Sequence, residues 1–372
     1  MSSTTDDFEI FLVAAPGLET VLCAEAEAAG FATPRAVPGG VKIRGLWPDV
    51  WRANLELRGA GRVLARIDSF QVEQLDKLAR RARRVPWAKV LRPDVPVQVE
   101  VTCSNSRIYH TGAAAERIED AIRDKLGAGI AKDAAVTIMA RFDNNIVSIS
   151  VDTSGELLHK RGHRQGVHRA PMRETMAALF LRQCGYDGRE PVVDPMCGAG
   201  TFVIEAAEIA TGLRPGRSRS FAFEQLATFD AAAWQRMRAT AATASPAVRC
   251  YGSDRDEAAI AISRANAALA GVAACTTFEQ RTVSDLRPPE GPRGLVIVNP
   301  PYGDRIGDTA KLKALYRALG QTLMSRFAGW RVGLVTSEKP LAYATGLPFL
   351  PPTAPVAHGG LRVTLFRTDQ LP

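Results

Sequence analysis

The sequence predicts an α/β protein in which a doubly wound, mostly parallel sheet follows two small α+β units. From Pro171 onward, short buried apolar runs alternate with helical stretches, the pattern of parallel strands joined by helices. Before that point, strands, helices and the hairpin signal Asp143-Asn144-Asn145 are typical of α+β units. We therefore divide the chain into an α+β domain (1–62), a second α+β domain (63–152), a basic linker (153–170) and the α/β domain (171–372).

Apolar periodicity predicts the individual elements. In the first two domains it predicts helices at about 17–30, 47–57 and 113–126, and strands at Ile10–Ala14, Val41–Arg44, Ala65–Phe70, Pro96–Thr102, Ala135–Phe142 and Ile146–Val151. In the α/β domain the expected strands are Pro191–Val193, Arg249–Gly252, Thr276–Arg281, Leu295–Val298, Arg331–Thr336 and Arg362–Phe366. Residues 213–247 form a long insertion before the second of these strands.

The composition is that of a globular protein, with 46% hydrophobic and 23% charged residues. No apolar run approaches the roughly 18 residues of a membrane span. The first residues are polar and acidic, which is unlike a signal peptide. The six cysteines contain no CxxC pair, and we expect them to be reduced thiols in a cytoplasmic protein. We also favour a monomer.

The formal net charge of +8 suits a polyanionic partner. Two basic runs, 80–84 and 159–173, favour contacts with phosphate groups. The alternative is that each run forms a solvated face, which is the usual role of such runs. His159 and His163 have a spacing that could suggest a metal, but no cysteine or carboxylate cluster completes the ligand set. We therefore expect no metal site.

The most informative motif is Asn299-Pro300-Pro301-Tyr302, which directly follows an apolar strand. Open α/β sheets hold their ligands at the carboxyl ends of their strands. The Asn299 side-chain oxygen and the Pro300 carbonyl can each accept one N–H of an amino group on a flat ring, on which Tyr302 can stack. The alternative is that Pro-Pro only ends the strand in a turn.

Three other strand ends carry groups suited to a nucleoside with an ammonium group. Asp194 precedes a glycine-containing turn, Cys197-Gly198-Ala199-Gly200, and is well placed for the ammonium. Asp254 can take both ribose hydroxyls, and Asp285 can accept an adenine amino N–H. Each carboxylate alone is more often a cap or a turn residue, as we expect for Asp256. Their order along the chain favours a binding site.

This order resembles the class I S-adenosylmethionine-dependent methyltransferases, in the amino-methylating branch with an NPPY motif. Residues 170–178 and the loop Asp194-Pro195-Met196-Cys197-Gly198-Ala199-Gly200-Thr201 are similar to the THUMP-containing RNA guanine-N2 methyltransferases. The segments 16–19, 106–112 and 213–234 resemble their N-terminal ferredoxin-like domain, their THUMP domain and their insertion. The bacterial large-subunit (23S) rRNA members are the most similar.

The resemblance implies a Rossmann-like methyltransferase domain preceded by ferredoxin-like and THUMP domains, with S-adenosylmethionine as cofactor and 23S rRNA as partner. Catalysis is expected from Asn299, Pro300, Pro301 and Tyr302. Cofactor binding is expected from Asp194, Pro195, Cys197, Gly198, Gly200, Thr201, Asp254, Asp285 and Asn299. RNA binding is expected from Arg107, Tyr109, Lys160, Arg161, Arg164 and Arg169.

Four alternatives remain at this point. A tRNA guanine-N2 methyltransferase has the same architecture. A DNA amino-methyltransferase shares the pocket chemistry but is expected to carry a DNA target-recognition domain. A protein-glutamine methyltransferase also holds an amide with NPPY, and the basic charge argues against it. A non-catalytic RNA-binding protein is disfavoured by the intact loop and motif.

Overall fold

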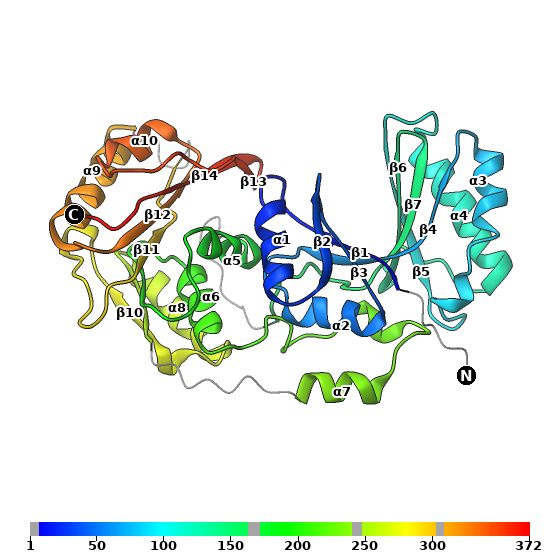
Figure 1. The fold of residues 1–372 in the computed structure, drawn as a ribbon, viewed down its shortest axis with the longest axis horizontal. Helices are drawn as coiled ribbons and strands as arrows, with labels where there is room; N and C mark the ends of the chain where they lie inside the picture. The colour runs from blue at the N-terminus through cyan, green and yellow to red at the C-terminus, as the bar shows by residue number, and fades with distance from the viewer. Residues whose placement is uncertain (1–6, 163–171, 240–247, 303–308) are drawn as a thin grey trace. The chain divides into compact units, whose positions relative to one another are not determined.

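The computed structural model describes residues 7–162, 172–239, 248–302 and 309–372 (Figure 1). The chain divides into two compact units. Unit 1 comprises the described residues of 1–14, 23–158 and 219–240, and unit 2 those of 15–22, 159–218 and 241–372. Each unit is built on its own seven-stranded sheet.

Unit 1 contains one sheet with the strand order β2-β3-β1-β4-β7-β6-β5. Neighbouring strands are antiparallel except β5 and β6. The strands are β1 (Phe8–Val13), β2 (Ala32–Val37), β3 (Gly40–Gly45), β4 (Arg62–Gln71), β5 (Val97–Ser104), β6 (Val136–Asp143) and β7 (Ile146–Asp152). The helices before residue 130 are α1 (Glu19–Ala28), α2 (Trp47–Glu56), α3 (Leu75–Ala82) and α4 (Thr111–Leu126).

The strand β4 joins the two expected N-terminal domains. It pairs with β1 of the first domain along one edge and with β7 of the second along the other. Both domains therefore contribute to one continuous hydrogen-bonded ladder. The division between residues 62 and 63 remains a proposal. This boundary would fall at the start of β4, the strand that pairs with strands of both domains.

The middle of the insertion belongs to unit 1. Its segment 219–239 includes α7 (Ala231–Ala239) and carries aromatic rings that pack on α2. Trp51 of α2 stacks on Phe223 with ring centroids 6.0 Å apart, and Phe223 meets Trp234 edge-on at 5.0 Å. The Phe223 N–H donates to the Thr153 carbonyl at 3.0 Å. These contacts make the segment part of the core of unit 1.

Unit 2 contains a second sheet with the order β10-β9-β8-β11-β12-β14-β13. Its first five strands are parallel, and β14 is antiparallel to both its neighbours. The strands are β8 (Val192–Asp194), β9 (Cys250–Asp254), β10 (Thr276–Gln280), β11 (Leu295–Val298), β12 (Arg331–Thr336), β13 (Val356–His358) and β14 (Leu361–Arg367). This confirms the predicted doubly wound α/β domain.

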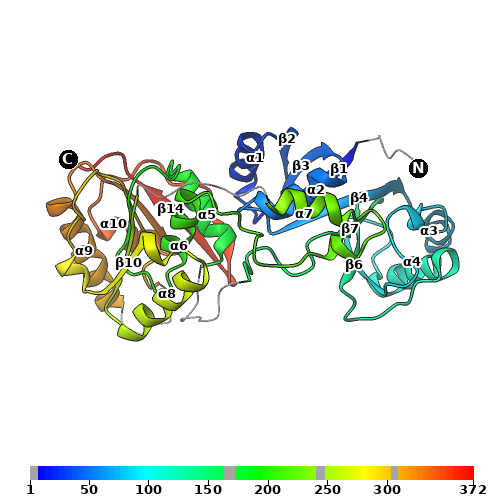
Figure 2. The same cartoon turned by 90° about the horizontal axis from the view of Figure 1, so that it is seen from below.

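Helices cover both faces of this sheet. Figure 2 shows α5 (Glu174–Gln183), α6 (Thr201–Ala210) and α8 (Glu257–Leu269) on one face. The other face carries α9 (Thr309–Arg326) and α10 (Lys339–Ala344). A buried core joins Val296, Val298 and Leu334 of the strands to Leu319 and Leu323 of α9. Among the described residues, no helix is both long enough and apolar enough to cross a bilayer.

The predicted strands differ from the observed ones only at their ends. The strand expected at Pro191–Val193 is Val192–Asp194, and that expected at Arg249–Gly252 is Cys250–Asp254. Asp194 and Asp254 are thus the last residues of their strands. The periodicity did not predict β2, which has no buried residue, or the three-residue β13, because neither has a distinct apolar pattern.

Candidate functional site

The strand order of unit 2 contains one topological switch point. From β8 the chain continues to β9 and β10 on one side, and it then returns to β11 on the other side of β8. Ligands of open α/β sheets bind at the carboxyl ends of the strands beside such a point. Asp194 ends β8 and Asn299 directly follows β11, so the two strands at the switch point carry two predicted site residues.

The loop between β8 and α6 is held in shape by two glycines and by α8. Gly198 and Gly200 have φ angles of 52° and 84°, in the left-handed region that favours glycine. The Ser263 hydroxyl of α8 donates to the Gly198 carbonyl at 2.7 Å, and the Asn266 amide donates to the Ala199 carbonyl at 3.1 Å. The sequence analysis missed Ser263 and Asn266, although two polar residues on an otherwise apolar helix face are a usable signal.

Asp254 ties this loop to the neighbouring strand. Its carboxylate accepts the Gly198 N–H at 3.1 Å and the Asp256 N–H at 3.1 Å. Asp256 in turn caps α8 by accepting the Ala258 N–H at 3.0 Å, which confirms its expected role. The structure therefore brings Asp254 together with the glycine loop, as the predicted cofactor site requires.

Asp194 is buried, with 2% of its surface exposed. Burial raises the pKa of its carboxyl to about 8, the Met196 N–H at 3.1 Å opposes this rise, and the nearby Asp254 charge adds to it. A buried carboxyl in this state ionises readily when a cation binds beside it. The electrostatics therefore suit the predicted ammonium contact.

Cys197 is also buried, and burial together with Asp194 and Asp254 raises its thiol pKa well above the ordinary value. The thiol is a poor nucleophile in this state, because the thiolate is the reactive form. A buried thiol of this kind suits a packing role in the loop. Pro195 and Thr201 flank the same turn, and α6 begins at Thr201.

Asp285 lies in a short helical turn, Val283–Asp285, after β10. Its carboxylate accepts the Thr282 hydroxyl at 2.6 Å and is exposed. Arg326 of α9 donates to the Ser284 and Leu286 carbonyls, both at 2.8 Å, and so fixes the turn. Its adenine contact remains a prediction.

In the NPPY motif, Asn299 has a buried side-chain oxygen. This Oδ1 accepts no hydrogen bond within the described part of the chain. Such atoms are rare in folded proteins and call for an explanation. Tyr302 is only 6% exposed, so stacking on a base requires its surroundings to move. Its stacking role therefore also remains a prediction.

The Tyr316 side chain of α9 contacts both the NPPY motif and the end of β12. Its hydroxyl lies 3.3 Å from the Pro301 carbonyl and 3.1 Å from Thr336 Oγ1 at the end of β12. One hydroxyl can donate to the carbonyl and accept from the threonine at the same time. The local sequence does not indicate this role, because Tyr316 follows the same spacing as the other buried residues of α9.

The structure corrects one predicted RNA contact. Arg161 is 1% exposed, and its Nε donates to Glu205 Oε1 of α6 at 2.9 Å. A carboxylate buried in an apolar helix needs a paired cation, and Arg161 supplies it. Arg161 is therefore a core residue, and the two glutamates of α6, Glu205 and Glu208, are the signal that could have revealed it.

The remaining predicted RNA contacts fall into three groups. Arg107 and Tyr109 lie in the exposed segment between β5 and α4, where the Arg107 side chain pairs with Glu73 at 2.5 Å and the Tyr109 ring lies 4.2 Å from that of His110. Lys160 is exposed in unit 2. Arg164 and Arg169 lie outside the described residues. Across the described ranges, no three His, Cys, Asp or Glu side chains gather as metal ligands.

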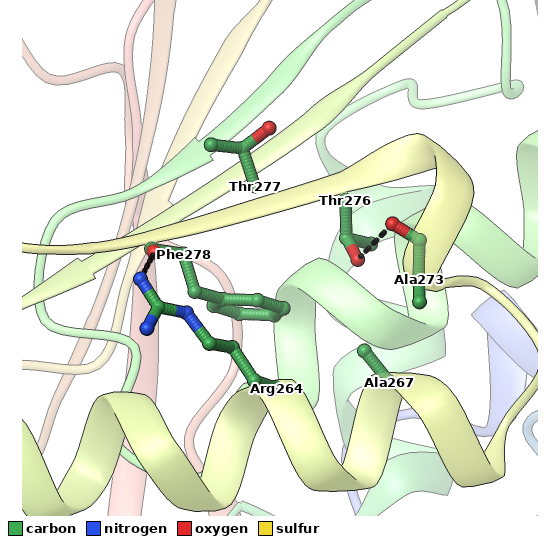
Figure 3. Close-up of a pocket in the computed structure, with 6 residues that line it drawn as sticks. All are labelled: Arg264, Ala267, Ala273, Thr276, Thr277 and Phe278. Atoms are coloured by element: carbon green, nitrogen blue, oxygen red, sulfur yellow. Dashed lines mark hydrogen bonds between the residues drawn. The ribbon is translucent and has the colours of Figure 1, made fainter.

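A separate cavity of about 290 Å³ lies between α8 and β10 (Figure 3). It is lined by Arg264, Ala267, Ala273, Thr276, Thr277 and Phe278, and the Arg264 guanidinium donates to the Phe278 carbonyl at 2.6 Å. Thr276 pairs with Cys250 at the amino end of β9. Part of the cavity lining is therefore at the amino ends of the strands, whereas the candidate site is at their carboxyl ends.

Two segments of the chain match known families. Residues 161–347, half of the chain, match the family described as "RMKL-like, methyltransferase domain", and residues 9–64 match "RlmL ferredoxin-like domain". The chain is 33% identical over 352 residues to the ribosomal RNA large subunit methyltransferase K/L of Psychromonas ingrahamii, covering 91% of this chain and 47% of that protein. The chain spans about half the length of the curated relatives it matches.

Two crystal structures resemble the whole described chain. One, from Listeria monocytogenes and described as a predicted N6-adenine-specific DNA methylase, has a TM-score of 0.88 and 29% identity, covering 99% of this chain and 97% of the other. The other, SMU.472 complexed with SAH, has a TM-score of 0.89 and 26% identity, covering 99% and 100%. Because the family model covers half of the chain and the switch-point site lies within it, the chain belongs to the family of RMKL-like methyltransferase domains, whose cofactor is S-adenosylmethionine.

Proposed function

We propose that the chain transfers a methyl group from S-adenosylmethionine to the exocyclic N2 amino group of a guanine in RNA, with 23S rRNA as the favoured substrate. The observation that carries this proposal is the buried Asn299 Oδ1, which accepts no hydrogen bond from the residues that the structure describes and lies in an Asn-Pro-Pro-Tyr motif at the switch point. An acceptor in that position is satisfied by a donor that arrives with a substrate.

The residues beside the glycine loop fit the cofactor. A Cβ built on Gly198 would meet no atom within 4 Å, so a ligand can approach this backbone closely. Asp194 would pair with the ammonium group of the methionine end, and Asp254 would bind the ribose hydroxyls. Asp285 would accept from the adenine amino group. S-adenosylmethionine supplies the methyl group and an electrophilic carbon.

The chain would contribute alignment. Asn299 Oδ1 and the Pro300 carbonyl would each accept one hydrogen of the guanine amino group, which directs the nitrogen lone pair out of conjugation with the ring. Tyr316 holds the adjoining Pro301 carbonyl at 3.3 Å, so the acceptors are positioned before the substrate arrives. Proximity and orientation of this kind can contribute roughly 7–11 kcal/mol to lowering a barrier.

The RNA substrate is supported by the names of the K/L relatives and by the net charge of +8. We assign RNA contacts to Arg107, Tyr109 and Lys160, and to Arg164 and Arg169 outside the described residues. Residues 63–152 would form a THUMP domain that recognises RNA shape. A guanine within RNA structure must be unstacked to reach the site, at a cost of a few kcal/mol.

The test is methyl transfer from labelled S-adenosylmethionine to total RNA, followed by mass spectrometry of the nucleosides. N2-methylguanosine in 23S rRNA supports the whole proposal, and the same product in tRNA supports the chemistry but replaces the substrate. Label found only in DNA adenine or in protein overturns the RNA assignment.

The matched variant in this assay is Asn299→Ala. It should reduce kcat on the order of 100-fold, because it removes an acceptor from the transition state, and leave cofactor affinity nearly unchanged. Calorimetry measures that affinity separately. Equal losses of kcat and of cofactor affinity would contradict the assignment of Asn299 to the target base.

A further inference from the structure

Helix α3 of unit 1 carries a basic face to which the proposed function gives no role. The helix and the turn after it contain Lys77, Arg80, Arg81 and Arg84, and all four side chains are exposed. The Arg84 N–H donates to the Arg81 carbonyl at 2.9 Å, so the helical path continues through this turn. At 3.6 residues per turn, the four residues fall within an arc of about 100°. We call them the α3 basic face.

The opposite side of α3 fixes this face in place. Leu78 and Ala82 are buried, and α3 lies against α4 (Figure 1). Arg83, which lies outside the basic face, pairs with Asp124 of α4 at 3.0 Å. The helix is therefore anchored through its other side, and the basic face is presented to solvent by a rigid element.

The cations of the α3 basic face lack carboxylate partners. None of the four forms an ion pair with a residue that the structure describes. The Arg81 guanidinium carbon lies over the Phe70 ring, 4.7 Å from its centroid. Asp76 of the same helix lies about 100° around the axis from Lys77 and pairs with none of these cations within the described ranges.

Several surface arginines elsewhere in unit 1 show the opposite pattern. Each has a nitrogen within 3.4 Å of a carboxylate oxygen, and they are Arg44, Arg92, Arg107, Arg117, Arg123 and Arg141. Single exposed cations without an ion pair also occur among the described residues, such as Arg35 of β2. The α3 basic face differs because it gathers four cations that have no carboxylate partner.

This arrangement is unfavourable for the helix itself. Lys77 and Arg81 are four residues apart, as are Arg80 and Arg84, and like charges at this spacing repel each other. The helix dipole favours cations in the last turn and offsets part of the repulsion. The dipole does not explain why no carboxylate accompanies them. An anionic partner would supply the missing negative charge.

A phosphate backbone fits this face. The guanidinium group binds phosphate oxygens through two parallel N–H donors, and lysine binds phosphate as a point charge. From Lys77 to Arg84 the face extends for roughly 10 Å along the helix axis. Its cations therefore form a row, which matches the row of phosphate groups along a nucleic-acid strand.

We propose that the α3 basic face binds the phosphate backbone of the substrate RNA. This inference rests on the proposed function, since the RNA is the substrate named there. It adds a surface distinct from the contacts assigned to Arg107, Tyr109 and Lys160. Phosphate contacts carry no sequence information, so the face supplies affinity and orientation, and other residues select the nucleotide.

The first test uses the double variant Arg80→Gln/Arg84→Gln and a transcript of 23S rRNA. Filter binding at several salt concentrations gives the slope of log K against log salt. Each phosphate contact contributes about 0.7 to this slope on single strands, so the variant's slope should be less steep by about 1.4. At 0.1 M salt this corresponds to an affinity about 25-fold lower.

The same variant is examined for its fold and its cofactor site. Its affinity for S-adenosylmethionine, measured by calorimetry, should equal that of the wild type. Its melting temperature should stay the same or rise, because glutamine is a comparable helix former and the repulsion between like charges is relieved.

The control is Arg35→Gln/Arg362→Gln, which makes the same change in net charge at exposed cations of β2 and β14. Neither arginine forms an ion pair with a described residue. The control should keep the wild-type slope. An equal loss of slope in both double variants would overturn the proposal, because RNA would then respond to net charge alone.

The second test asks whether the contact is independent of sequence. Both proteins are titrated with an unrelated RNA of the same length as the transcript. Arg80→Gln/Arg84→Gln should weaken binding to both RNAs by the same factor, as expected for phosphate contacts. A loss confined to the 23S transcript would overturn the assignment to the backbone.

The outcomes separate this inference from the proposed function. RNA binding with an unchanged slope in Arg80→Gln/Arg84→Gln overturns the role of the α3 basic face and leaves the methylation proposal standing. A wild type that binds RNA through this face but forms no methylated guanosine overturns the methylation proposal and supports the surface. Loss of binding to anionic phosphatidylserine vesicles, with RNA binding unchanged, assigns the face to a membrane and overturns the inference.

Discussion

Asp194→Asn is the substitution whose effect can be worked out most directly. Burial raises the Asp194 pKa from its ordinary 3.8 to about 8, so between these values the folded chain binds a proton that the unfolded chain releases. The free energy of unfolding of the wild type therefore falls as pH rises, by about 1.4 kcal/mol per pH unit. Asparagine does not titrate, and it keeps an oxygen for the Met196 N–H.

From pH 5 to pH 7, the wild type should thus lose about 3 kcal/mol relative to Asp194→Asn. Urea unfolding of the ligand-free proteins at pH 5, 6 and 7 measures this difference. Asp256→Asn is the matched control, because this exposed N-cap is replaced by an equally good one and its difference from the wild type should not change with pH. A pH-independent difference between the wild type and Asp194→Asn would refute the reasoning about burial.

Three further substitutions test the surroundings of the site. Tyr316→Phe removes the hydroxyl that bonds both the Pro301 carbonyl and Thr336, and loss of the bond to Pro301 should lower kcat about 2- to 13-fold while the KM for S-adenosylmethionine stays unchanged in steady-state assays. Arg161→Met removes the guanidinium that lies 2.9 Å from the buried Glu205 carboxylate, and it should lower the free energy of unfolding by about 3–5 kcal/mol in urea, with no specific loss of RNA affinity. Tyr109→Ala should weaken RNA binding in filter assays by about 1–3 kcal/mol if the ring stacks on a base, whereas Tyr343→Ala, which also removes an exposed tyrosine, should not.

The fold of unit 2 was predictable because the short apolar runs of β8, β11 and β12 alternate with helical stretches, and because β8 and β9 end in a polar residue and β11 is followed by one. The polar residues at these ends, Asp194, Asp254 and Asn299, follow from the rule that parallel strands present their carboxyl ends at one edge. The structure brings these residues to that edge. Their chemical roles are a separate matter, which the proposed experiments address.

Contacts between distant segments were not predictable. Ser263 and Tyr316 support the site through partners 65 and 15 residues away in the chain, and no local pattern specifies such pairs. The RNA contact predicted for Arg161 was wrong because a run of basic residues predicts an exposed face. In the structure Arg161 instead pairs with the buried carboxylate of Glu205 in the core. The continuous sheet of unit 1 escaped prediction because its long strand β4 serves both halves.

The insertion makes unit 1 discontinuous, and this affects the order in which the molecule can form during synthesis. Phe223 and Trp234 complete the packing around Trp51, yet they lie beyond the glycine loop that begins at Asp194. A growing chain must therefore extend past that loop, with the first segment of unit 2 already made, before unit 1 can close its core. A fragment that stops at the linker should expose Trp51 and aggregate, although its sheet strands would all be present.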